Sequence, residues 1–208
     1  DAISASRVLV KLWTTPGTFS ETRIAEVLHD RLYVAGLPRG MHAYDGRTGQ
    51  RLWSYTGQYP VDYPPTEDAG KIFILESGQA VAVRDRDGVE LTRHRTRLAA
   101  LSPLFPTRLV WTFASTNERV IGIAAGSGAQ KWYVAVDHPI LHIIEAGADK
   151  LIALTRRGTL YAISRSAHEV LWHVRLPGNG WSSLAFDGAR VYVGSTDRYF
   201  YALDLDRG

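Results

Sequence analysis

The sequence predicts an all-β protein, a five-bladed β-propeller of four-stranded antiparallel blades, and three observations lead to that prediction. Tryptophans recur at a spacing of 40 residues, with one gap of 79 that skips a single repeat. Four short apolar runs separated by turn residues fill each period, and no stretch shows helical periodicity. A repeat of this length and content is typical of a propeller blade. The recurring residues are Trp13, Trp53, Trp132 and Trp172.

The clearest repeat runs from Arg31 to Trp53, RLYVAGLPRGMHAYDGRTGQRLW. Its three β-branched and aromatic runs, separated by hairpin turns, predict three strands, and the preceding RIAEVL predicts a fourth. Copies follow at Lys71–Thr92, Lys150–Trp172 and Arg190–Gly208, while the third, around Trp132, is the most altered. We expect a single domain over residues 1–208. Its blades span about 19–55, 62–94, 100–134, 139–174, and 181–208 together with 7–14.

The run from Ala43 to Trp53 reads A-x-D-x-x-T-G-x-x-x-W. It resembles the tryptophan-docking motif of quinoprotein (PQQ)-like repeat propellers, and the chain is similar to the propeller of the outer-membrane assembly lipoprotein family. The resemblance implies that each tryptophan packs between adjacent blades, while the glycine permits the turn. The predicted docking residues are Trp13, Trp53, Trp132, Trp172, Gly49, Gly88, Gly128 and Gly208. The motif is incomplete in two copies, where Thr92 takes the tryptophan place and His168 the glycine place.

The two chain ends carry complementary halves of one motif. The last copy stops at Gly208, before its tryptophan, and the N-terminal VLVKLW ends at Trp13 without the first half. We expect the N-terminal strand to complete the last blade and close the ring, which removes an open sheet edge and favours a monomer. The alternative is a fragment of a larger seven- or eight-bladed protein.

Composition excludes several classes of site. The net charge of +3 is too small to indicate a nucleic-acid partner, and no apolar run is long enough to span a membrane. Cysteine is absent, which excludes disulfides, thiolate metal sites and cysteine nucleophiles. The compartment does not follow from composition. Only the family resemblance, to bacterial proteins, favours a periplasmic or extracytoplasmic location.

One rim of the predicted propeller carries candidate binding residues. The connections between blades and the second-to-third-strand turns open on this rim, where we place Tyr59, Tyr63, Asp137, His138 and Trp181. An aromatic, lightly charged rim suits another protein or a small ligand such as a sugar. The plainer interpretation is that these aromatics only plug the channel mouth. Asp137 and His138, even with His142, match no zinc-binding spacing.

A second candidate surface is basic. Arg93, Arg95 and Arg97 alternate along an outer strand, which places them on one face, and Arg84 and Arg86 lie on the adjacent turn. Such a patch suits an acidic partner, an anionic surface or nucleic acid. The alternative is protection of a sheet edge by charge. No aromatic residues interleave these arginines, so nucleic acid is not the expected ligand.

These features predict a non-catalytic binding or scaffolding module, for protein interaction or ligand sensing. The resemblance implies that catalytic quinoproteins carry an adjacent-cysteine disulfide and a calcium site. This chain has no cysteine and no obvious cluster of calcium-binding carboxylates, so we expect no cofactor, no metal and no enzyme activity. A small carbohydrate-binding propeller is the alternative. It would require equivalent pockets in each blade, whereas the rim loops differ among the copies.

Overall fold

The computed structural model describes residues 13–17, 19–96, 100, 102–107, 110–115, 118–180 and 183–208. In these residues there are 19 strands, which form four four-stranded sheets and one three-stranded sheet, all antiparallel. The structure thus confirms the all-β class and the predicted type of sheet. No helix in the described ranges is long and apolar enough to cross a membrane.

Each sheet is a meander in which consecutive strands pair. The first sheet contains β1 (Glu21–Leu28), β2 (Arg31–Leu37), β3 (Met41–Asp45) and β4 (Arg51–Tyr55). The second contains β5 (Thr66–Asp68), β6 (Lys71–Glu76), β7 (Gln79–Arg84) and β8 (Glu90–Arg95). The third contains β9 (Phe105–Pro106), β10 (Val110–Ser115), β11 (Arg119–Ala124) and β12 (Gln130–Ala135). The fourth contains β13 (Ile140–Ala146), β14 (Lys150–Thr155), β15 (Thr159–Ser164) and β16 (Glu169–Arg175). The last contains β17 (Ala185–Phe186), β18 (Arg190–Gly194) and β19 (Phe200–Asp204).

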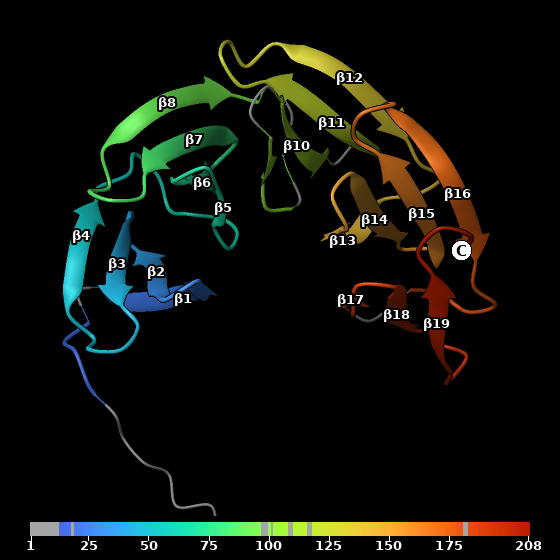
Figure 1. Cartoon of the computed structure of the whole chain (residues 1–208), viewed down its shortest axis with the longest axis horizontal. Helices are drawn as coiled ribbons and strands as arrows, with labels where there is room; N and C mark the ends of the chain where they lie inside the picture. Colours follow the sequence, from blue (N-terminus) through green and yellow to red (C-terminus); the bar gives the residue numbers. More distant parts are fainter. Residues whose placement is uncertain are drawn as a thin grey trace, which may run out of the picture.

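The five sheets follow one another along an open arc, with the later strands of each sheet toward the outside (Figure 1). The first and last sheets lie at opposite ends of this arc, and β19 is the edge strand of the last sheet. The described residues therefore do not confirm a closed ring. The N-terminal strand that we expected to complete the last blade lies mostly outside the described residues, which begin at Trp13.

Four apolar clusters hold neighbouring sheets together, and we call each sheet-to-sheet interface a seam. Between the first two sheets, Tyr33 and Ala35 of β2 meet Ile72 and Ile74 of β6 in one buried cluster. The other three seams contain equivalent clusters. Because the middle sheets pack on both sides, both faces of their inner strands are buried, which explains why these strands are apolar without strict alternation.

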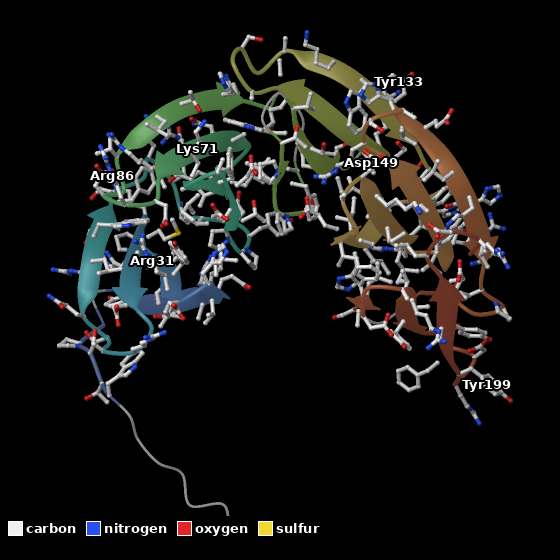
Figure 2. All side chains as sticks on the ribbon, viewed as in Figure 1. Arg31, Lys71, Arg86, Tyr133, Asp149 and Tyr199 are labelled. Carbon is white, nitrogen blue, oxygen red and sulfur yellow. The ribbon has the colours of Figure 1, made fainter. Side chains whose placement is uncertain are left out.

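The outer face of the last sheet exposes a large apolar side chain that is buried at the equivalent position of the fourth sheet. Leu160, which faces the last sheet, is fully buried, whereas the equivalent Phe200 is 88% exposed. Tyr192 and Tyr199 are also exposed, and Figure 2 shows Tyr199 at the free end of the arc. This face has the apolar character of a seam but contacts no further sheet in the described ranges.

Candidate functional site

Two seams, and the contact of Trp13 with the first sheet, contain the same docking arrangement. The indole N–H of the tryptophan donates a hydrogen bond to a backbone carbonyl of the adjoining sheet. That carbonyl belongs to the residue three positions before the motif glycine. The bonds are Trp13 Nε1 to Gly46 O (3.1 Å), Trp53 Nε1 to Asp85 O (2.6 Å) and Trp172 Nε1 to Leu205 O (2.9 Å). A Cβ on Gly49 or Gly88 would come within 2.5 or 2.6 Å of the indole, so both positions require glycine.

The seam between the second and third sheets keeps this arrangement without a tryptophan. Thr92 pairs with Ala82 in the place that Trp53 holds opposite Ala43. His94, two residues further along β8, packs on Gly128 instead, with Nε2 2.9 Å from Ala125 O. Since a carbonyl only accepts, this nitrogen donates. Sequence reasoning missed His94 because it followed tryptophan alone.

The seam between the third and fourth sheets keeps the tryptophan and loses the glycine. Trp132 stacks on the imidazole of His168, with ring centroids 4.8 Å apart and planes at 21°. His168 adopts a φ of 60°, in the left-handed region that glycine occupies in the other copies. The indole N–H of Trp132 is buried and has no hydrogen-bond partner among the described residues.

The candidate basic patch is divided by the structure. Arg93 is only 15% exposed, and its Nη1 donates to the fully buried carboxylate of Glu76 at 3.0 Å. Its Nη2 contacts Glu90 (2.8 Å) and the hydroxyl of Tyr55 (2.7 Å), and this ion cluster joins the first and second sheets. Burial and the charge of Glu76 raise the pKa of Tyr55 well above its usual range.

The other arginines of that patch are placed differently. Arg95 is exposed, and Arg97 lies outside the described residues. Arg84 and Arg86 both pair with Asp87, at 3.1 and 3.4 Å. Of the predicted patch and its adjacent turn, Arg95 is thus the one described arginine that is exposed and outside these ion pairs.

Asp137 and His138 lie together, and the carboxylate is held by its own sheet. Asp137 Oδ2 accepts from Thr159 Oγ1 at 2.7 Å and is 3.7 Å from His138 Nδ1. Burial acts against ionisation, but hydrogen bonds from Thr159 and Thr155 outweigh it and hold the pKa of Asp137 below its usual value. No group of three or more His, Asp or Glu side chains suited to a metal occurs in the described ranges.

The two described aromatic candidates of the rim differ in exposure. Tyr59 is 44% exposed, whereas Tyr63 packs against the core of the seam between the second and third sheets. The hydroxyl of Tyr63 is 3.5 Å from Ala100 O, and burial, followed by the charge of Asp62, raises its pKa. Trp181 lies outside the described residues.

Sequence reasoning also missed a set of arginines, here called the arginine rim. Its members are exposed and form no ion pair in the part of the chain that the structure describes. They are Arg156 and Arg157 in the β14–β15 turn, Arg175 at the end of β16, and Arg198 in the β18–β19 turn. The adjacent arginines at 156 and 157 are a signal that the sequence already contained.

Local contacts bring together the chain segments that carry the arginine rim. The Cβ position of Gly158 is 3.0 Å from Arg175 Nη1 and 2.3 Å from Gly178 O, so the β16–β17 connection crosses the β14–β15 turn. In that connection, Asn179 N donates to Thr196 Oγ1 at 2.8 Å, which ties it to the β18–β19 turn. Both turns therefore lie at the same end of adjoining sheets.

Comparisons with known proteins agree with this architecture. A family model described as outer membrane protein assembly factor BamB matches residues 10–114 and 116–208. Among solved structures, BamB from Moraxella catarrhalis has a TM-score of 0.72 at 16% identity, covering 88% of this chain and 57% of that one. The computationally designed Ika8 protein has a TM-score of 0.72 at 13% identity, covering 88% and 58%.

The chain thus spans a little over half the length of these two structures, and at such identities the likeness concerns the fold. A search of curated proteins found no match. The repeated seams, the docking tryptophans and the match over nearly the whole chain show that this protein belongs to the BamB family of PQQ-like repeat β-propellers.

Proposed function

We propose that this chain is a non-catalytic protein-interaction scaffold whose arginine rim binds an acidic surface of a partner protein. The observation that carries the proposal is a set of four exposed arginines on neighbouring turns and a strand end, which form no ion pair with the described residues. Guanidinium groups bind carboxylates in a bidentate manner, and arginine is enriched in protein interfaces. The family description, an assembly factor, is compatible with a scaffold role.

Three acidic residues near this end of the sheets are occupied by structural bonds. Asp62 Oδ2 accepts from Ser77 N at 2.6 Å, and Asp137 accepts from Thr159. Asp197 Oδ2 accepts from the hydroxyl of Tyr201 at 2.5 Å. These carboxylates brace turns and do not pair with the arginine rim, so the rim keeps its positive potential for a ligand.

The same occupation supports a non-catalytic role. A general base needs a free lone pair directed at the substrate, and Asp137 directs its Oδ2 at Thr159 within its own sheet. The candidate pair Asp137–His138 is best explained as the anchor that fixes the 136–139 connection to β15. Tyr161 completes that anchor, since its hydroxyl accepts from Asp137 N at 3.2 Å.

Binding to an Asp/Glu-rich peptide, measured by calorimetry at two salt concentrations, tests the scaffold. We expect saturable binding that weakens with salt, and at least about a ten-fold loss for Arg156→Glu/Arg157→Glu, because like charges placed together are strongly unfavourable. Arg47→Glu is the control, since Arg47 is 81% exposed and lies in the β3–β4 turn at the opposite end of the strands. Absence of binding, or an equal loss in the control, would contradict the proposal.

We also propose that residues 7–14 form the outer strand of the last sheet. Two observations support this: Trp13 packs on the first sheet as outer-strand tryptophans do elsewhere, and β19 has no fourth strand beside it in the described ranges. Because the chain has no cysteine, spin labels at Thr14→Cys and Asp204→Cys report their separation directly. A short distance in a monomer supports closure. A long distance, as in the arc of Figure 1, favours the alternative of a larger ring.

A further inference from the structure

The replacement of glycine by His168 changes the seam between the third and fourth sheets. A Cβ at Gly49 or Gly88 would approach the docking indole to 2.5 or 2.6 Å, closer than real Cβ contacts, and one at Gly208 would approach it to 3.1 Å, a tight contact. A side chain at position 168 therefore requires the indole of Trp132 to lie elsewhere, stacked on the imidazole. Its N–H loses the carbonyl that the other docking tryptophans contact, and remains buried.

A cavity of about 240 Å³ opens beside this displaced tryptophan. Three of its lining residues carry buried polar atoms without a protein partner, namely Trp132 Nε1, Thr112 Oγ1 and Arg165 Nε. Buried polar atoms nearly always have hydrogen-bond partners, so three on one cavity mark a polar site. Figure 2 shows Asp149, another lining residue, in this seam.

Each of the three atoms exposes less than 1 Å², so a ligand reaches them only if the lining side chains shift, and they then define what it must offer. The nitrogens of Trp132 and Arg165 are donors only, and the Thr112 hydroxyl donates or accepts. A ligand must therefore present at least two acceptor atoms. The other nitrogens of Arg165 are already engaged, Nη1 with Glu145 at 2.6 Å and Nη2 with Ala148 O at 3.1 Å.

Among the described residues, the charges around the cavity are net negative, which disfavours an anion. Glu145 balances Arg165, and Asp149 adds a further negative charge, since hydrogen bonds from Ser164 and Ser166 outweigh the opposing effect of burial and lower its pKa. Asp149 Oδ1 accepts one hydrogen bond, from Ser166 N at 2.9 Å, which leaves it capacity for a second. A neutral ligand with hydroxyl groups satisfies both the donors and this acceptor.

We propose that this seam cavity binds a small neutral polyhydroxylated ligand of monosaccharide size. The volume equals about eight times the ~30 Å³ that one water occupies in the liquid, so it exceeds the space of a single structural water. The cavity lies beside the β13–β14 and β15–β16 turns, at the opposite end of the strands from the arginine rim. The inference therefore does not depend on the proposed scaffold function.

The test follows the indole N–H of Trp132 by ¹H–¹⁵N NMR of the whole chain during titration with glucose, galactose, mannose and N-acetylglucosamine. Trp132→Phe assigns the signal by its disappearance. We expect one sugar to shift this signal saturably. Thr112→Val should weaken binding by roughly three- to ten-fold through loss of one hydrogen bond. Trp172→Phe is the matched control, because its N–H is bonded to Leu205 in the next seam.

Three outcomes would overturn the inference. The Trp132 signal does not move with any sugar up to the solubility limit. Sodium acetate shifts it as strongly as the sugars do, which would mean that the site does not discriminate against anions. Thr112→Val and Trp172→Phe weaken binding equally, which would place the ligand elsewhere or reflect general loosening of the fold.

Discussion

The seam between the second and third sheets and the seam between the third and fourth sheets each depart from the docking motif, in opposite ways. The former has lost its tryptophan but keeps Gly128, and His94 still reaches the carbonyl of Ala125. The latter keeps Trp132 but has His168 in place of glycine, and the indole N–H is unpaired. The glycine, and not the tryptophan, decides whether the inter-sheet hydrogen bond forms.

In the second-to-third seam, the second sheet has no docking tryptophan, but the third sheet contributes a large aromatic side chain, Trp111, to the same interface. Trp111 of β10 occupies the position that Leu151 holds in the fourth sheet, and its ring lies 5.3 Å from His94 and 5.2 Å from Phe73. The large aromatic side chain of this seam therefore belongs to the third sheet, while His94 of the second sheet makes the contact with Gly128. No comparable exchange of side chains fills the cavity beside Trp132.

The seam between the first two sheets keeps both the tryptophan and the glycine, so the two altered seams can be compared with it. We expect the largest loss of stability when its ion cluster is broken. Arg93→Met leaves the fully buried Glu76 carboxylate without its cation, which we expect to lower the free energy of unfolding by about 3–5 kcal/mol. Urea denaturation measures this change. Arg47→Met, which removes an exposed ion pair, should cost less than about 1 kcal/mol. Equal effects would mean that Arg93 is not a structural bridge.

Gly88→Ala tests whether the inter-sheet contact requires glycine at the motif position. Its Cβ would lie 2.6 Å from the Trp53 ring, and its φ of 71° is strained for alanine, so we expect a loss of about 3 kcal/mol. Gly70→Ala separates the two causes, because Gly70 has a φ of 73° and no atom within 4 Å of its Cβ position. That control should lose only about 1 kcal/mol. Similar losses would show that backbone strain alone makes these glycines necessary.

These seams separate the contacts that the sequence predicted from those that it did not. Repeat spacing predicted the strands and the packing of Trp53 and Trp172, because docking needs one residue type at one position. It did not predict His94, since the contact with Gly128 is made two residues beyond the expected place. It also treated Arg93 as a surface residue, because alternation gives a face but not the buried carboxylate of Glu76 opposite it.

The candidate site was predicted less well than the fold for a physical reason. Binding surfaces lie in turns, where neighbouring sheets determine which side chains meet. Arg175 joins Arg156 and Arg157 only because the connection through Gly178 crosses their turn. The cavity beside Trp132 likewise involves two residues in different sheets, His168, on which the indole stacks, and Gly122, whose missing side chain leaves room for the indole.

Acid should affect the last sheet through its turn carboxylate. Hydrogen bonds from Ala189 N, the Tyr192 hydroxyl and Arg190 N lower the pKa of Asp187 from 3.8 to about 2. Because the folded pKa lies below the unfolded one, the stabilisation is present above pH 3.8 and is lost as the pH falls toward 2. We expect the Tm to fall over this range, and to fall less in Asp187→Asn. An identical fall in both proteins would contradict this assignment.

The smallest expected effect is a gain in stability when glycine replaces His168 at the motif position of the fourth sheet. His168→Gly removes the left-handed strain of a non-glycine residue and lets the indole of Trp132 approach the carbonyl of Arg165, three residues earlier, as the other tryptophans do. Loss of the ring stacking and the flexibility of glycine oppose this gain, so we expect about 1 kcal/mol of stabilisation in urea denaturation. The Trp132 N–H signal should then move toward those of bonded tryptophans, and the sugar response should disappear as the cavity closes. If the variant is less stable and its N–H signal is unchanged, stacking on His168 outweighs the glycine contact, and glycine does not decide the hydrogen bond in this seam.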